Sequence, residues 1–304
     1  MIPVFNAGAF LPDALRSVLA QDRGRAEMQI AVVDDASTDI DVRRLVEQIA
    51  GDRVEYHPQS QNVGSVANLN TSIGLSRGRL VHLLHADDRV LPGYYEKMGA
   101  LFASYPQAGA CFSALRYIDE QGAVTSVESS YAPAECVLEN WLHTIATASR
   151  SQYAATAVRR SVYEELGGYF GVSYGEDWEM QVRIASRYPV AYTPDILAEY
   201  RTHAGSISRE KVRSGANLAD LAWVVDTIQG YLPDSERNEL RSQAETNCAR
   251  LALHYAGRLW HFEGDSEASN RQLDGALRLS DDNEIRRGAE ALRAAMATGE
   301  RNPS

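Results

Sequence analysis

Two pairs of adjacent acids are the residues of this chain whose types and spacing best fit a chemical role. They are Asp34-Asp35, directly after the apolar run 30–33, and Asp87-Asp88, shortly after the apolar run 80–84. Adjacent carboxylates repel each other unless a cation or a donor-rich ligand lies between them. Two apolar runs with this ending predict one cleft that binds a metal ion and a polar ligand. For either pair taken alone, an ordinary turn or helix start is the alternative.

A third acidic group and a polar loop come later in the chain. Glu176-Asp177 follows Gly175 at an expected helix start, where acids favour the helix dipole. The segment 200–208 contains Arg201 and His203, which could reach a diphosphate or a metal if this loop folds over the site.

The elements that must position these acids alternate along the first hundred residues. Apolar spacing predicts strands at 2–5, 29–35, 53–56 and 80–85 and helices at 11–20, 42–49 and 63–76. Such strand–helix units form a mostly parallel sheet with flanking helices, and ligands bind beyond the carboxyl ends of its strands. The first strand has about four residues, which is short for a buried strand. Either it is stunted or native residues are missing before it.

The second half of the chain is expected to be less regular and then helical. Residues 110–117 and 123–128 form a predicted hairpin, residues 137–147 a predicted helix, and residues 189–200 an extended segment. After residue 208 we expect helices, among them a hairpin of residues 248–262 and 270–279 that resembles one tetratricopeptide unit and caps the core. Ser37, Thr38 and Asp39 are expected to cap the helix at 42–49.

Composition excludes several classes of protein. The 304 residues are 44% hydrophobic and carry a net charge of -11, so the chain can bury a large core but lacks the basic face of a general nucleic-acid binder. No apolar run approaches the ~18 residues of a membrane span. No signal peptide is visible. Three scattered cysteines indicate reduced thiols. We expect a cytoplasmic protein, with peripheral association at the inner membrane face left open.

Five short motifs in this order resemble family 2 glycosyltransferases of the GT-A fold. They are Ile2-Pro3-Val4-Phe5-Asn6, Val32-Val33-Asp34-Asp35, Asn62-Val63-Gly64 with Asn68, His85-Ala86-Asp87-Asp88 and Gly175-Glu176-Asp177-Trp178. The resemblance covers about residues 1–205. It implies an α/β GT-A domain over 1–208, with a nucleotide-binding half at 1–105 and an acceptor half at 106–208, followed by a helical region at 209–304.

The same resemblance implies an activity. The expected enzyme is an inverting, metal-dependent glycosyltransferase, hexosyltransferase-like, that moves a sugar from a nucleotide sugar, with a UDP-sugar favoured, to a hydroxyl group. The acceptor would be a saccharide or lipid-linked saccharide in polysaccharide or glycoconjugate biosynthesis. Two alternatives are a sugar-nucleotide nucleotidyltransferase, which would want a glycine-rich, arginine-bearing loop after the first strand, and a degenerate core that acts as a non-catalytic binding module.

The resemblance also assigns roles to residues. Asp177 is the expected catalytic base, and Asp88, with Asp87 second, is the expected ligand of Mn²⁺ or Mg²⁺, while His85 stands where the family often has its first acid. Glu176, Trp178, Arg201 and His203 are assigned to the acceptor or to the loop at the diphosphate. The residues expected to bind the nucleotide are Pro3, Val4, Phe5, Asp34, Asp35, Asn62, Gly64, Asn68 and Asp87.

Overall fold

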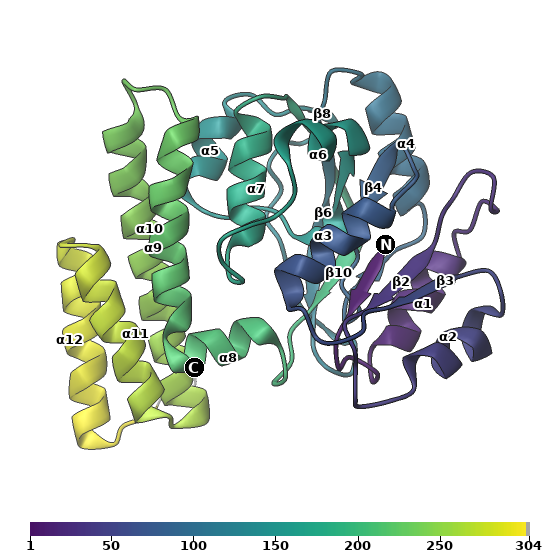
Figure 1. The fold of residues 1–304 in the computed structure, drawn as a ribbon. Helices are drawn as coiled ribbons and strands as arrows, with labels where there is room; N and C mark the ends of the chain where they lie inside the picture. Colours follow the sequence, from purple (N-terminus) through teal and green to yellow (C-terminus); the bar gives the residue numbers. More distant parts are fainter. Residues whose placement is uncertain (302–304) are drawn as a thin grey trace. The chain divides into compact units, whose positions relative to one another are not determined.

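The computed structural model describes residues 1–301, which divide into two compact units (Figure 1). The first unit contains residues 1–141, 151–171 and 187–202, and the second contains 142–150, 172–186 and the chain from residue 203 onward. The domain boundary expected at residue 208 stays a prediction. Residues 302–304 of the expected helical region lie outside the described residues.

The first unit begins with a three-stranded parallel sheet, in the order β1-β2-β3. Every residue of β2 is buried, and helix α1 buries Leu11, Leu15 and Val18 in the same core. This spacing puts the three side chains on one face of the helix. The strand–helix alternation expected from the sequence is therefore confirmed. Its elements are β1 (Ile2–Val4), α1 (Leu11–Leu19), β2 (Ala31–Asp34), α2 (Val42–Ala50), β3 (Glu55–Pro58) and α3 (Ser65–Leu75).

A second, mixed sheet of the same unit has the strand order β4-β9-β6-β10-β5. Strand β10 pairs parallel with β6 and antiparallel with β5 and β8, and β6 forms the expected hairpin with β7. The elements are β4 (Leu80–His82), β5 (Arg89–Val90), α4 (Tyr94–Ser104), β6 (Ala110–Ile118), β7 (Val124–Val127), β8 (Cys136–Val137), a 3₁₀ turn (Tyr153–Ala155), β9 (Thr156–Arg159), α6 (Arg160–Leu166) and β10 (Val190–Arg201).

Main-chain hydrogen bonds at Met1 join the two sheets. The Met1 nitrogen donates to the carbonyl of His82 at 2.9 Å, and the N–H of Leu84 donates to the carbonyl of Met1 at 3.0 Å. This is the bonding pattern of a parallel pair. The chain after β4 therefore runs alongside β1, in the same direction as β1 and β2. Both acid pairs consequently lie at the carboxyl edge of neighbouring strands, as the sequence predicted.

Two local expectations were wrong. The helix expected at 137–147 begins later, because Cys136–Val137 pairs with β10 as strand β8 and only Trp141–Thr147 is helical, as α5. The cap of α2 is Asp41, whose side chain accepts a hydrogen bond from the N–H of Arg44. Side chains of the expected cap segment instead accept hydrogen bonds from the loop after β1, so they tie two loops together: Ser37 from the N–H of Asn6, Asp39 from the N–H of Gly8.

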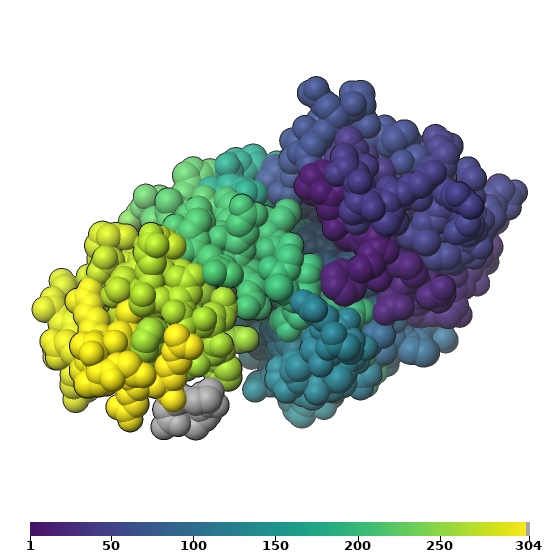
Figure 2. Space-filling model, turned by 90° about the horizontal axis from the view of Figure 1, so that it is seen from below, coloured from purple at the N-terminus to yellow at the C-terminus, as the bar shows by residue number. Residues whose placement is uncertain are grey.

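The second unit is helical. Helix α11 packs against α10 and α8, and α12 packs against both α10 and α11, around clusters that include Leu273, Ile285 and Leu292. Figure 2 shows the C-terminal helices as one solid body, coloured lime to yellow. The helical hairpin expected from the sequence is confirmed. The elements are α7 (Glu176–Ala185), α8 (Ile207–Ser214), α9 (Ala216–Ile228), a 3₁₀ turn (Gln229–Tyr231), α10 (Arg237–Arg258), a π-helical turn (Leu259–Glu263), α11 (Ser266–Leu279) and α12 (Asn283–Thr298).

Candidate active site

The Asp34–Asp35 pair lies in a setting rich in hydrogen-bond donors. Asp34 accepts from the N–H of Ser37 at 3.0 Å and from the Tyr56 hydroxyl at 2.7 Å. Asp35, which is 1% exposed, accepts from the N–H groups of Val63 at 2.7 Å and Gly64 at 3.0 Å. Four donors from three segments therefore stabilise two adjacent charges. Burial and the Asp34 carboxylate together raise the pKa of Tyr56, so its hydroxyl keeps its proton as a donor.

The loop 62–64 is held at the start of α3 by this pair. Gly64 has φ +88°, a conformation that favours glycine, and its N–H also lies 3.1 Å from the Asn62 side-chain oxygen. Asn68 is buried and donates to the carbonyl of Val33 at 3.0 Å, which fixes α3 against β2. Asn68 therefore holds helix against strand, and its role as a nucleotide ligand stays a prediction.

The strand end at residues 3–5 lies beside the same pair. The N–H of Asp35 donates to the carbonyl of Val4 at 2.8 Å, and the Val4 side chain is buried. Pro3 is half-buried, while the ring of Phe5 is exposed at the strand end. The loop that follows begins at Asn6 with φ +48°. These residues and the Asp34–Asp35 pair lie side by side, and their shared role in binding a nucleotide, which the family resemblance implies, stays a prediction.

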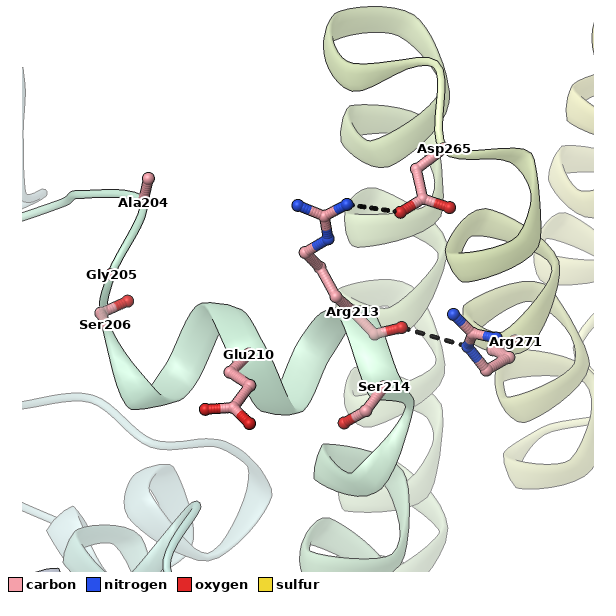
Figure 3. Close-up of a pocket in the computed structure, with 8 residues that line it drawn as sticks. All are labelled: Ala204, Gly205, Ser206, Glu210, Arg213, Ser214, Asp265 and Arg271. Atoms are coloured by element: carbon pink, nitrogen blue, oxygen red, sulfur yellow. Dashed lines mark hydrogen bonds and ion pairs between the residues drawn. The ribbon is translucent and has the colours of Figure 1, made fainter.

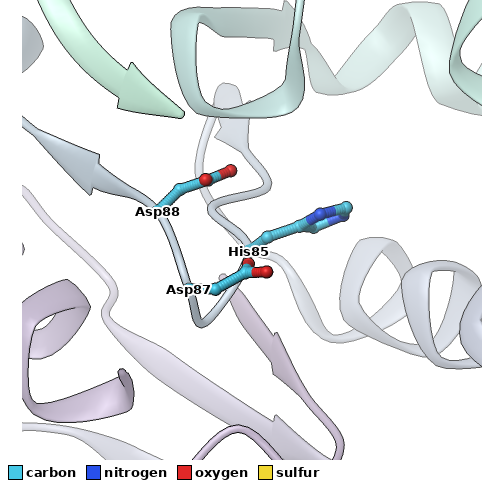
Figure 4. A group of neighbouring side chains, drawn as sticks. All are labelled: His85, Asp87 and Asp88. Carbon is cyan, nitrogen blue, oxygen red and sulfur yellow. The ribbon is translucent and has the colours of Figure 1, made fainter. Parts of the chain in front are cut away.

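The side chains of His85, Asp87 and Asp88 come from one turn and point to the same side of it (Figure 4). One potential ligand atom from each of the three side chains lies within 4.8 Å of the other two. Two carboxylates and one imidazole form a donor set that suits a divalent cation such as Mn²⁺ or Mg²⁺, with the carboxylates preferred by Mg²⁺ and the imidazole better suited to transition metals. The residues present therefore fit the expected metal ion.

The electrostatics of this turn differ from those of the first pair. Asp88 is 1% exposed, and burial together with the neighbouring Asp87 charge raises its pKa well above the usual range. Burial lowers the pKa of His85, whose ring lies against that of Tyr153 with centroids 4.4 Å apart. A neutral imidazole has a lone pair available for a metal. A bound cation would offset the negative charge of the two carboxylates.

Arg201 ends β10 and is directed toward this turn. Its side chain, 1% exposed, donates through Nε to the carbonyl of Asp87 at 2.8 Å and through Nη2 to Asp13 at 3.1 Å. Its Nη1 donates to the carbonyls of Asp119 at 3.1 Å and Glu120 at 3.0 Å. The main-chain N–H of Arg201 donates to Oδ1 of Asp88 at 2.9 Å. A role for Arg201 at the diphosphate stays a prediction, and its N–H groups already have these protein acceptors.

Sequence reasoning missed a buried ion network beside the turn. Glu199 is 2% exposed and accepts from Arg89 Nε at 2.6 Å and from Arg116 at 2.5 and 2.8 Å. Arg89 directly follows Asp88 and also lies 3.7 Å from Asp13. The position of Arg89 after the acids was the one available signal. Glu199 comes 110 residues later along the chain, and no local pattern connects it to the turn.

The second unit contains the remaining candidates. Asp177 is half-buried at the start of α7 and accepts from the N–H of Trp178 at 2.7 Å, while burial raises its pKa from 3.8 to about 6. Trp178 is 1% exposed and donates from its indole nitrogen to the carbonyl of Ile145 at 2.6 Å, so it belongs to the core of its unit. Glu176 is buried in the same helical turn.

His203 comes shortly before α8, and the loop after it lines a surface hollow of about 510 Å³ (Figure 3). Its lining contains two arginines and two acids: Arg213 lies 2.8 Å from Asp265, and Arg271 donates to the carbonyl of Arg213 at 3.1 Å. This hollow therefore has no concentration of one charge. The lining residues are Ala204, Gly205, Ser206, Glu210, Arg213, Ser214, Asp265 and Arg271.

Comparisons with known proteins agree with the fold. The family model described as "Glycosyl transferase family 2" matches residues 1–167. An uncharacterized protein of Mycobacterium tuberculosis (strain CDC 1551 / Oshkosh) is 26% identical over 256 residues, covering 78% of this chain and 77% of the relative.

Two solved structures are similar in fold. S. aureus TarS 1-349 in complex with UDP-GlcNAc has a TM-score of 0.68 at 12% identity, covering 98% of this chain and 88% of TarS. The mannosyltransferase PcManGT from Pyrobaculum calidifontis, in complex with GDP-Man and Mn²⁺, has a TM-score of 0.59 at 20% identity, covering 99% and 80%. At these identities the likeness shows a shared GT-A-like fold, which confirms the expected fold class.

Proposed function

Because this chain belongs to glycosyl transferase family 2, we propose that it is an inverting, metal-dependent transferase that moves a sugar from a nucleotide sugar to a hydroxyl acceptor. Membership makes it a glycosyltransferase, and the proposal adds the mechanism. The observation that carries the proposal is the group of His85, Asp87 and Asp88, whose ligand atoms converge at the strand edge where the Asp34–Asp35 pair also lies.

The donor is proposed to be a nucleoside diphosphate sugar. The Asp34–Asp35 pair, Asn62 and Gly64 would recognise the nucleoside, together with the main chain of residues 3–5. A UDP-sugar is favoured, and the similar structures were solved with a UDP-sugar and a GDP-sugar. The identity of the nucleobase is therefore one of the questions that the titration below must answer.

The metal ion is proposed to be Mn²⁺ or Mg²⁺, held by Asp88 and Asp87. When bound, it would neutralise the charge that develops on the departing nucleoside diphosphate. The similar mannosyltransferase structure contains Mn²⁺. His85 is close enough to the two carboxylates to join them, and an imidazole ligand would favour Mn²⁺ over Mg²⁺.

Asp177 is proposed as the general base. A carboxylate whose pKa is raised to about 6 is a stronger base than an ordinary aspartate and is still mostly ionised at pH 7. It would accept the proton of the acceptor hydroxyl while that oxygen attacks the anomeric carbon. Such a direct displacement inverts the anomeric configuration. Glu176 and His203 are proposed to assist at the acceptor or the diphosphate, and Trp178 to support that region from the core.

The acceptor is proposed to be a saccharide or a lipid-linked saccharide in polysaccharide or glycoconjugate biosynthesis. None of the described helices combines the length and the apolar character needed to cross a bilayer. A cytoplasmic location, with or without peripheral membrane association, stays a prediction.

Calorimetric titration of UDP and GDP, each with and without Mn²⁺, tests the donor half of the proposal. We expect one nucleotide to bind wild type in the presence of Mn²⁺ and at least tenfold more weakly without it. Asp88→Asn should lose the Mn²⁺-dependent part. The control is Asp281→Asn, because Asp281-Asp282 is another adjacent acid pair, between α11 and α12. Absence of Mn²⁺-dependent binding to folded wild type would contradict the proposal.

A further inference from the structure

Arg201 makes an unusual set of contacts for a buried arginine at the end of a strand. Four hydrogen bonds from its side chain reach main-chain carbonyls and one carboxylate, in three separate segments. The ring of Phe10 lies 5.0 Å from the guanidinium carbon and covers it. Because the planar guanidinium fixes the directions of its N–H groups, these contacts define a single position for it.

The same residue contacts both acids of the candidate metal site. Its side chain binds the carbonyl of Asp87, and its main-chain N–H binds the carboxylate of Asp88. The first contact orients the peptide between the two acids, and the second orients the side chain of the second acid. We propose that Arg201 is a positioning residue, which holds the Asp87–Asp88 pair in the geometry that a divalent cation needs. This inference rests on the metal role proposed above.

The surrounding contacts explain why this position is rigid. Asp13 of α1 and the hairpin carbonyls of Asp119 and Glu120 hold the guanidinium. Arg89, which directly follows Asp88, and Glu199, two residues before Arg201, face each other in the β5–β10 pair and form an ion pair in which Glu199 is buried. The turn is therefore fastened to β10 at two neighbouring points. Arg201 supplies one of them, and Glu199 supplies the other.

This role differs from direct binding of a diphosphate by Arg201. A phosphate ligand would stabilise bound nucleotide with or without metal. A positioning residue acts through Asp87 and Asp88, so its loss would weaken metal binding and leave metal-free nucleotide binding unchanged. Residues that orient metal ligands typically contribute 10–100-fold in metal affinity.

The test compares Arg201→Lys with Arg159→Lys. Arg159 is a matched control in the same unit, since it also donates to main-chain carbonyls, of Ala108 and Phe102, and lies over the Phe102 ring. Two measurements are made on each full-length protein: the dissociation constant of Mn²⁺ alone, from the electron paramagnetic resonance of the free ion, and hydrogen exchange in peptides covering residues 85–90 and 119–122.

We expect Arg201→Lys to weaken Mn²⁺ binding about tenfold or more, to leave metal-free UDP binding within twofold, and to speed exchange in both peptides. Arg159→Lys should leave all three near wild type. Asp13→Asn, a milder change, should shift Mn²⁺ affinity in the same direction by a smaller factor. A folded Arg201→Lys protein with wild-type exchange and Mn²⁺ affinity would overturn the inference. Hydrogen exchange needs no metal, so it tests the role of Arg201 even if wild type binds no Mn²⁺. Absence of Mn²⁺ binding to wild type would instead overturn the proposed function.

Discussion

The Asp34–Asp35 and Asp87–Asp88 pairs have the same sequence pattern and opposite surroundings. Four hydrogen-bond donors, from Ser37, Tyr56, Val63 and Gly64, reach the first pair. In the second pair, Asp88 accepts from the N–H of Arg201, and burial beside Asp87 raises its pKa. The first pair thus organises the protein around it, whereas in the second pair burial opposes the charge of Asp88. The comparison teaches that the same acid pair can be set among hydrogen-bond donors or buried beside a like charge, and that the sequence pattern alone does not distinguish the two.

The largest expected effect is the loss of activity in Asp88→Asn. Removing a metal ligand should reduce Mn²⁺-dependent sugar transfer by about 10³-fold, because the metal stabilises charge on the leaving group. The melting temperature should stay equal or rise, since burial opposes the charged form of Asp88 and the oxygen of a neutral amide can still accept the N–H of Arg201. Transfer rates and thermal unfolding of the same preparation check both points. A marked loss of stability in this variant would mean that the two acid pairs are not distinct.

Asp35→Asn should show the reverse result: a loss of stability with metal binding unchanged. The single oxygen of the amide cannot accept both N–H groups of Val63 and Gly64, so one of these donors faces the amide NH₂ group instead of an acceptor, at a cost of about 2 kcal/mol. The melting temperature should fall by about 4–8 °C, while Mn²⁺ binding without nucleotide stays near wild type. Thermal unfolding and Mn²⁺ titration measure the two quantities. Equal stability of the variant would remove the organising role assigned to this pair.

The pH dependence of activity and stability tests how burial affects Asp177, an acid outside both pairs. Its pKa is raised to about 6, so the transfer rate should fall about tenfold per pH unit below 6 and level off above it. The folded state binds this proton more tightly than the unfolded state. Stability should therefore decrease as pH rises from about 4 through 6. Asp177→Asn should lose activity at every pH and flatten this part of the stability profile; an unchanged profile would assign it to other groups.

The smallest expected effect is that of Asp41→Ala. Asp41 is an exposed acid that caps α2 through the N–H of Arg44, and loss of such a cap costs about 1 kcal/mol. The melting temperature should fall by about 2–4 °C with transfer rates unchanged. A clear drop in the transfer rate would show that the stability of α2 affects the acid pairs. Helix α2 would then have to be included in the comparison of the two pairs.

The parts of the fold that follow from short-range pattern were predictable. Burial of alternating strand and helix faces gave the parallel sheet, and the order of acids after strands gave the location of both pairs. The helix expected at 137–147 was wrong because Cys136 and Val137 pair with β10, a strand more than fifty residues away. Pairing of this kind leaves no mark in the local sequence.

The sequence singles out candidate site residues but does not show their hydrogen-bond partners. Asp88 and Asp35 were found from their neighbours in sequence, but the donors that distinguish them come from Arg201 and from loop 62–64. Arg201 was noticed as a cation and assigned to a ligand, because a sequence shows the charge and hides the acceptors. Glu199 was missed since an isolated glutamate in an extended segment resembles any exposed one.

Strand β10 has a consequence for how the protein is made. It pairs with β5, β6 and β8, and its last residue supplies the contacts at Asp87 and Asp88. During synthesis, both acid pairs leave the ribosome more than a hundred residues before Arg201 does. The second pair therefore passes through an early stage without the contacts from Arg201, and pairings this distant in sequence form slowly. A nascent chain stalled before residue 201 would contain all four acids but would lack the contacts that order the second pair.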